Sequence, residues 1–150
     1  MKREYLELTR LIERLHRRFL DVLRAELGRM GIKELNAVQA LLLSNIGEEE
    51  IAIRDLVERG YYQGSNVSYN IKKLTDMGYL EQERSQHDRR SVTVRLTDKA
   101  LKVVARVREL EDVHAGNIEA SGLKPAGLES ATETLRQIER LWAEHIRYGG

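Results

Sequence analysis

The chain has 150 residues, one proline, no cysteine and a formal net charge of +1. This length suits one domain with a sizeable core, and the lack of cysteine excludes disulfides, thiolate metal ligands and thiol-based peroxide sensing. No apolar run approaches the ~18 residues of a membrane span, and the N-terminal segment Met1-Lys2-Arg3-Glu4 lacks the apolar core of a signal peptide, so we expect a cytoplasmic protein.

Two helices are predicted at the start of the chain. Apolar side chains recur at helical spacing over residues 4–28, between arginines and acids, which is typical of a long amphipathic helix. A second, more apolar helix is predicted from Ala37 to Ile46. Asn36 and Gln39 have the spacing of a capping box, in which the two side chains satisfy each other's backbone N–H groups, and Gly47 ends the helix.

The next segment has the pattern of a helix-turn-helix. A short strand at residues 51–53 and a brief helix at 54–59 precede the turn 60–64, and Ser65 is expected to cap the following helix. That helix would bury Val67, Ile71 and Leu74. Its other side would carry short polar and cationic groups, with Asn70 at the boundary: Ser65, Asn66, Ser68, Tyr69, Asn70, Lys72 and Lys73.

A hairpin follows this helix. Residues 79–84 and 91–96 alternate as paired strands do, and a polar loop joins them. The hairpin is rich in arginine but has one aspartate between residues 84 and 95: Arg84, Arg89, Arg90, Arg95 and Asp88. A helix has the width of the major groove, and a projecting arginine can enter the neighbouring minor groove, so the pair predicts a winged helix-turn-helix that binds duplex DNA.

Two long helices are predicted after the hairpin. The first spans residues ~98–120, with Thr97-Asp98 as its cap, and the segments 121–122 and 124–127 break the pattern. The last helix has an apolar stripe: Leu128, Ala131, Leu135, Ile138, Trp142 and Ile146. The first, fifth and last helices are too long for a compact winged-helix core to cover, so their stripes need another partner.

The hairpin motif resembles a family signature. Asp88-x-Arg90, followed by Val94-x-Leu96-Thr97 and preceded by a helix ending Leu74-x-x-Met77-Gly78-Tyr79-Leu80, is similar to the pattern of the MarR family of transcription regulators. The likeness spans nearly the whole chain and is strongest over residues 51–97. It implies a mainly α fold with a small β-wing, a winged-helix region at about 33–97, and dimerisation helices at about 1–30 and 98–150 within a single domain, 1–150. An intrachain helical bundle is the alternative to a homodimer.

The predicted DNA contacts divide by chemistry. The Ser and Asn side chains at 65, 66, 68 and 70 can bond base edges or phosphates, and asparagine can pair bidentately with adenine. Lys72 and Lys73 suit phosphate, as do Arg84 and Arg89. The resemblance implies that Asp88 holds the Arg90 guanidinium by a salt bridge for insertion into the minor groove. The alternatives are an ordinary solvated helix face and an ion pair that merely braces a surface hairpin.

An effector pocket is a further implication of the resemblance. The family's pocket lies between the dimer helices and the DNA-binding region, where His16, Arg18, Ser44 and His114 are candidates; simple packing of the histidines is the alternative. The chain has no His-Glu-x-x-His element and no glycine-rich phosphate loop after a strand, so we expect no enzyme, no metal and no cofactor.

We therefore predict a homodimeric, sequence-specific regulator of transcription. It would bind a pseudo-palindromic duplex, act as a repressor and release DNA when a small-molecule effector binds. The competing hypothesis is a winged-helix module that binds proteins, because a fold does not determine function and the net charge is close to neutral.

Overall fold

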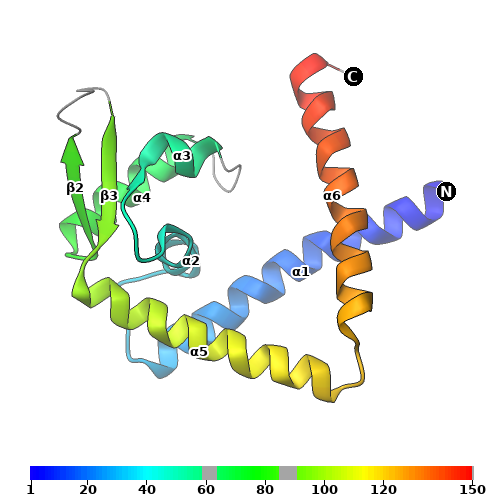
Figure 1. Ribbon diagram of the computed structural model, residues 1–150, viewed down its shortest axis with the longest axis horizontal. Coiled ribbons are helices and arrows are strands. Elements are labelled where there is room, and N and C mark those ends of the chain that lie inside the picture. Colours follow the sequence, from blue (N-terminus) through cyan, green and yellow to red (C-terminus); the bar gives the residue numbers. More distant parts are fainter. Residues whose placement is uncertain (59–63, 85–90, 150) are drawn as a thin grey trace. The chain divides into compact units, whose positions relative to one another are not determined.

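The computed structural model describes residues 1–58, 64–84 and 91–149, which form two compact units, Met1–Glu109 and Leu110–Gly150 (Figure 1). The N-terminal unit contains α1 (Lys2–Arg29), α2 (Ala37–Ile46), β1 (Ile51–Ala52), α3 (Ile53–Glu58), α4 (Gly64–Asp76), β2 (Leu80–Arg84), β3 (Val92–Leu96) and the first part of α5 (Asp98–Ala120). The C-terminal unit contains the rest of α5 and α6 (Pro125–Tyr148). The predicted class, mainly α with a small β-wing, is confirmed.

The strands form one antiparallel sheet in the order β1-β3-β2. Val94 at the centre of β3 lies opposite Gln82 on β2 and Ile51 on β1, and its side chain is fully buried. The hairpin of β2, β3 and the residues between them is called the wing below. Because β2 contacts α4, the wing and α4 belong to one module, as Figure 1 also shows.

The core of the N-terminal unit lies between α2, α3, α4, the sheet and the start of α5. The predicted stripe of α4 is confirmed, because Val67, Ile71 and Leu74 are at most 2% exposed. They pack with the apolar residues of the neighbouring elements, among them Leu42, Leu43, Leu56, Val94 and Val103. Burial of this stripe decides which side of α4 is left for a partner.

The start of α2 confirms the predicted capping box. The Asn36 side chain accepts a hydrogen bond from the Gln39 backbone N–H at 2.8 Å, and Gln39 Oε1 accepts one from the Asn36 backbone N–H at 3.1 Å. Two N–H groups that the first helical turn leaves without partners are thereby satisfied. The Gln39 side chain is buried, which gives it a second contact described below.

Two boundary predictions are wrong. α4 begins at Gly64, so Ser65 lies in its first turn and not before the helix. Residues 125–127 do not break the last helix, because Pro125 occupies its first turn, where the proline ring fits and the missing N–H costs nothing. The other predicted helices and strands agree with the structure to within one or two residues. No helix among the described residues is both long and apolar enough to cross a membrane.

A polar cluster fixes the connection between α1 and α2. The buried Tyr79 donates a hydrogen bond through its hydroxyl to the Glu34 carboxylate, and Lys99 Nζ lies 3.1 Å from the same carboxylate. Lys99 Nζ also donates to the Met77 carbonyl at 2.9 Å and lies 4.4 Å from the centroid of the Tyr79 ring. The Tyr79 hydrogen bond and then Lys99 hold the pKa of Glu34 below its usual 4.5.

This cluster predicts a pH-dependent stability. Because the pKa of Glu34 is lower in the folded protein, its contribution is fully present above pH 4.5 and is lost as the pH falls through the folded-state value. Thermal unfolding of the wild type and of Glu34→Gln between pH 3 and 7 should show a difference in melting temperature that is largest above pH 4.5 and shrinks in acid. Glu133→Gln on α6 serves as control, and a difference that is constant with pH would contradict the assignment.

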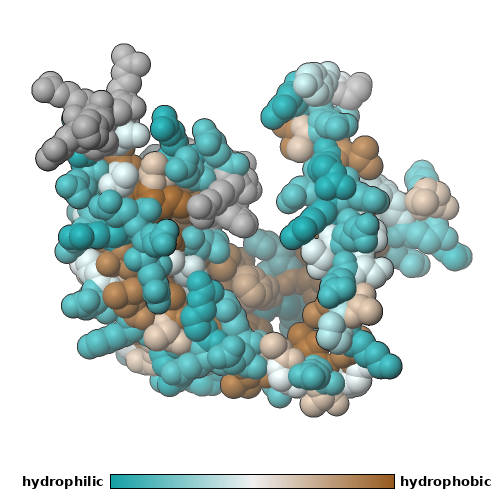
Figure 2. Space-filling model, viewed as in Figure 1, coloured by the Kyte–Doolittle hydropathy of each residue, from teal (hydrophilic) through white to brown (hydrophobic). Residues whose placement is uncertain are grey.

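The helix α6 of the C-terminal unit is exposed along its whole length. None of the 24 residues of α6 is buried, although its apolar side chains recur at alternating spacings of three and four over Leu128, Ala131, Leu135, Ile138 and Trp142. Leu135 and Trp142 are about 40% exposed. Figure 2 shows brown apolar atoms interspersed with teal polar ones along α6. Exposure of an apolar stripe to water is unfavourable, so a partner surface that covers the stripe would stabilise α6.

Candidate nucleic-acid interface

The outer face of α4 is polar, cationic and accessible. The predicted contact residues Asn66, Ser68, Tyr69, Lys72 and Lys73 are all exposed, and Tyr69 is 60% exposed. Lys73 Nζ lies 5.3 Å from the centroid of the Tyr69 ring one helical turn away, which favours a cation–π contact. The face therefore presents short hydrogen-bonding groups beside two ammonium groups, as a major-groove helix requires. Ser65 also lies in the first turn of α4, but its side chain is outside the described set.

Hydrogen bonds anchor the wing to the end of α4. Gln82 Nε2 on β2 donates to Thr75 Oγ1 at 2.9 Å, and the Thr75 hydroxyl donates to the Ile71 carbonyl at 2.7 Å. The Lys99 ammonium and the Thr97 hydroxyl bond the carbonyls of the turn between α4 and β2. These hydrogen bonds thus join the base of the wing to the end of α4.

Charge on the wing is partly cancelled within the sheet. Arg95 Nε donates to Glu81 Oε2 at 2.8 Å across the strands, and this carboxylate raises the pKa of the Arg95 guanidinium. The sequence pattern counts Arg95 among the wing's cations, whereas the register of β2 and β3 pairs it with Glu81. Arg84, at the end of β2, is exposed and remains a candidate phosphate contact. Asp88, Arg89 and Arg90 lie outside the described residues, and their roles stay predictions.

A hydrogen bond from α2 holds the side chain of Asn70. Its side chain is half-buried, and its Oδ1 accepts a hydrogen bond from Gln39 Nε2 at 3.2 Å. The sequence places Asn70 at the edge of the buried stripe, which the structure confirms. It did not reveal the bond to Gln39, because the two residues are 31 positions apart and only the packing of α2 against α4 brings them together.

The candidate effector residues differ in their surroundings. Ser44 is buried, and its hydroxyl donates to the Ala40 carbonyl of its own helix at 3.1 Å. His16 and Arg18 are exposed on α1, while the half-buried His114 belongs to the C-terminal unit. Within the N-terminal unit, Ser44 is thus buried, whereas the two candidates on α1 are open to solvent.

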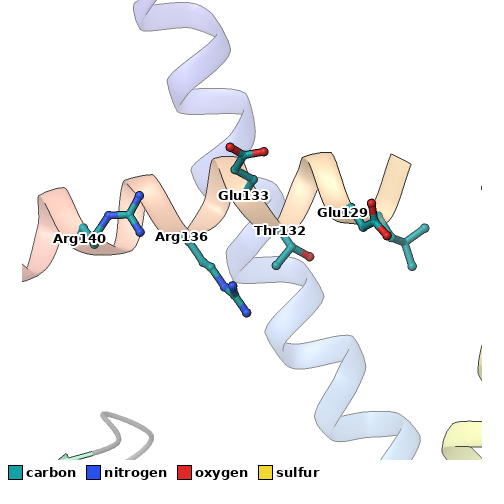
Figure 3. Close-up of a pocket in the computed structure, with 6 residues that line it drawn as sticks. Glu129, Thr132, Glu133, Arg136 and Arg140 are labelled. Carbon is teal, nitrogen blue, oxygen red and sulfur yellow. The ribbon is translucent and has the colours of Figure 1, made fainter. Parts of the chain in front are cut away.

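A hollow of about 650 Å³ lies along α6 and is lined by charged and polar residues of that helix, among them Glu129, Thr132, Glu133, Arg136 and Arg140. Figure 3 shows Glu133 and Arg136 leaving the helix in opposite directions, so these charges do not converge on one ligand. Over residues 1–58, 64–84 and 91–149, no three His, Asp or Glu side chains are grouped so as to hold a metal ion.

Known proteins are similar to this chain in sequence and in fold. The family model for a winged helix DNA-binding domain matches residues 35–100. The exopolysaccharide II synthesis transcriptional activator ExpG of Rhizobium meliloti (strain 1021) is 38% identical over 145 residues, which are 97% of this chain and 75% of that protein.

Solved structures agree with this match at the level of the fold. Streptococcus pneumoniae FabT in complex with DNA superposes with a TM-score of 0.74 at 16% identity, covering 93% of this chain and 98% of that one. The regulator BldR from Sulfolobus solfataricus gives 0.71 at 24% identity, covering 91% and 95%. A mutant MarR from E. coli complexed with operator DNA gives 0.70 at 19% identity, covering 90% and 95%.

Proposed function

The chain belongs to the MarR family of winged-helix DNA-binding transcriptional regulators, and we propose that it binds an inverted-repeat operator in the cytoplasm as a homodimer. In this proposal α4 of each protomer enters the major groove and each wing follows the adjacent minor groove. The observation that carries the DNA contact is the outer face of α4, where exposed asparagine, serine and lysine side chains lie opposite a fully buried stripe.

The exposed stripe of α6 supports the homodimer. A 24-residue helix with apolar groups on one side and no buried residue is costly in water, and a second copy of the same stripe would cover it. α1 adds to the argument, because Leu11, Leu15 and Phe19 are between 43% and 55% exposed. A two-fold dimer would set two α4 helices about 34 Å apart, one turn of DNA.

The direction of regulation follows from where the operator lies relative to the promoter. The sequence resemblance predicts repression, whereas the relative with 38% identity is named an activator. A bound dimer can block RNA polymerase or hold it at the promoter with the same DNA contacts. We keep repression, relieved by a small-molecule effector, as the proposal; a reporter gene behind the selected operator, with and without the protein, tests it.

The wing supplies a direct test of the DNA contact. Arg90→Ala should weaken operator binding by about 1–3 kcal/mol, because it removes a guanidinium proposed to enter the minor groove. Fluorescence anisotropy with a labelled duplex measures the affinity, and sedimentation should show an unchanged oligomeric state.

Asp88→Asn is the companion variant. It keeps Arg90 but removes the proposed partner that orients it, so a smaller loss of affinity is expected. If Arg90→Ala binds as tightly as the wild type, Arg90 does not contribute to DNA binding and the proposed insertion into the minor groove is wrong.

A further inference from the structure

We propose that Gln39 is a positioning residue for DNA reading, which turns the Asn70 side-chain amide so that its amino group faces the DNA. The inference rests on the proposed entry of α4 into the major groove. It assigns to Asn70 a preference for bases that present a hydrogen-bond acceptor, and to Gln39 the role of setting that preference from the neighbouring helix.

The orientation of Gln39 follows from its two hydrogen bonds. Its side chain is 4% exposed, and its Oε1 lies 3.1 Å from the Asn36 backbone nitrogen. An N–H can only donate, so the oxygen of the Gln39 amide must face Asn36. The amino group is then left on the side of Asn70, where Nε2 lies 3.2 Å from Oδ1. The capping box of α2 thereby determines the orientation of the Gln39 side-chain amide.

The same reasoning determines the orientation of Asn70. Gln39 Nε2 is a donor, so the Asn70 atom that meets it must be the oxygen. The Asn70 amino group then lies on the other branch of the amide. Asn66 and Lys73, one turn before and one turn after Asn70, are exposed on the outer face. Asn70 therefore offers DNA a donor, because its oxygen is engaged toward α2.

This orientation has a consequence for base preference. The bidentate contact between asparagine and adenine needs both amide atoms directed at the base edge, one as acceptor and one as donor. Asn70 with its oxygen held by Gln39 can donate a single hydrogen bond to guanine N7 or O6, adenine N7 or thymine O4, whereas cytosine offers only an amino donor in the major groove. Turning the amide so that its oxygen accepts from cytosine, or pairs bidentately with adenine, would leave the buried Gln39 amino group without its acceptor, a penalty comparable to a tenfold or larger base preference.

Gln39→Glu should reverse the orientation of the Asn70 amide while keeping the capping box of α2. A glutamate at this position of the helix still accepts from the Asn36 N–H, as in the usual capping box. Its carboxylate cannot donate to Asn70, so the Asn70 amide should turn its amino group toward the introduced carboxylate and its oxygen toward DNA. The outward oxygen then needs a base with an amino group, so cytosine, which the wild type disfavours, should become a favoured base at the position that Asn70 contacts.

The experiment is selection from a random duplex library at near-physiological salt, with sequencing of the retained DNA. The wild type, Asn70→Ala and Gln39→Glu are compared. We expect Asn70→Ala to lose a preference of about tenfold at one position of each half-site, where the wild type selects against cytosine. At the same position Gln39→Glu should select cytosine or adenine.

Two further variants keep the test interpretable. Gln137→Glu makes the same substitution at an exposed amide of α6, outside α4 and the wing, and it should leave that position unchanged. If circular dichroism shows that Gln39→Glu does not fold, Asn70→Asp presents an outward oxygen while still accepting from Gln39, and it should produce the same change of base.

Cytosine as the wild-type base at the Asn70-sensitive position would overturn the inference, because it presents no acceptor to the Asn70 amino group. An unchanged consensus in both Asn70→Ala and Gln39→Glu would also overturn it, since the bond would then only join α2 to α4. Both results leave a wild-type consensus in place. If the wild type selects no consensus at all, the proposed operator binding fails as well, which distinguishes the two failures.

Discussion

Leu135→Asp is expected to yield a folded monomer that binds an operator about 10²- to 10⁴-fold more weakly than the wild type. Leu135 lies at the middle of the exposed stripe of α6, and no residue of this helix is buried. A carboxylate there would be desolvated in a dimer interface but remains in water in a monomer, so the monomer is favoured. Loss of the second, linked half-site removes the gain in affinity that comes from binding both together.

Gln137→Asp is the matched control for this prediction. It adds the same carboxylate to an exposed position of α6, about 200° around the helix from Leu135. Sedimentation velocity should show a monomer for Leu135→Asp and a dimer for Gln137→Asp and the wild type. Circular dichroism reports folding of each variant. If Leu135→Asp remains a dimer with full affinity, the α6 stripe is not the interface.

The affinity for operator DNA is expected to fall about 10³- to 10⁵-fold between 50 and 200 mM salt. Each protomer brings five candidate phosphate or groove cations to α4 and the wing: Lys72, Lys73, Arg84, Arg89 and Arg90. Binding by a dimer would release a counterion at each neutralised phosphate, and added salt opposes this release. A protein-binding module has no such requirement, so the salt dependence separates the two classes of function.

The double variant Lys72→Ala/Lys73→Ala should lower the slope of log affinity against log salt by roughly four for a dimer. The matched control is Lys33→Ala/Lys102→Ala, which removes two exposed lysines from the α1–α2 connection and α5. Anisotropy titrations at several salt concentrations measure both slopes. Equal slopes for the two double variants would exclude α4 as the phosphate-binding face, and a wild-type slope near zero would favour the protein-binding alternative.

Predictions that depend on near neighbours in the chain agree with the structure. The α2 capping box joins residues three positions apart, and the α4 stripe repeats every three or four positions. The wing strands are predicted at 79–84 and 91–96 and are observed at Leu80–Arg84 and Val92–Leu96. The prediction fails at Pro125, because a proline ring disrupts the interior of a helix but fits its first turn, and the sequence pattern does not show which of these positions it occupies.

Contacts between distant residues were beyond the reach of these patterns. The sequence counts Arg95 among the cations of the wing, but the register of the hairpin places Glu81 opposite it. The Tyr79 hydroxyl meets Glu34, 45 positions away, where the start of β2 packs near the α1–α2 connection. A sequence pattern identifies each charged or polar group, but its partner depends on register and packing that no local spacing encodes.

The helices, the wing strands, the exposed polar face of α4 and the resemblance to a regulator family follow from the sequence alone, because each depends on side-chain periodicity or on a short motif. Which of the polar groups on α4 are already engaged depends on how distant parts of the chain pack together. Asn70 shows the physical reason: a side-chain amide is both donor and acceptor, and only the placement of Gln39 from another helix determines which of the two is left for DNA.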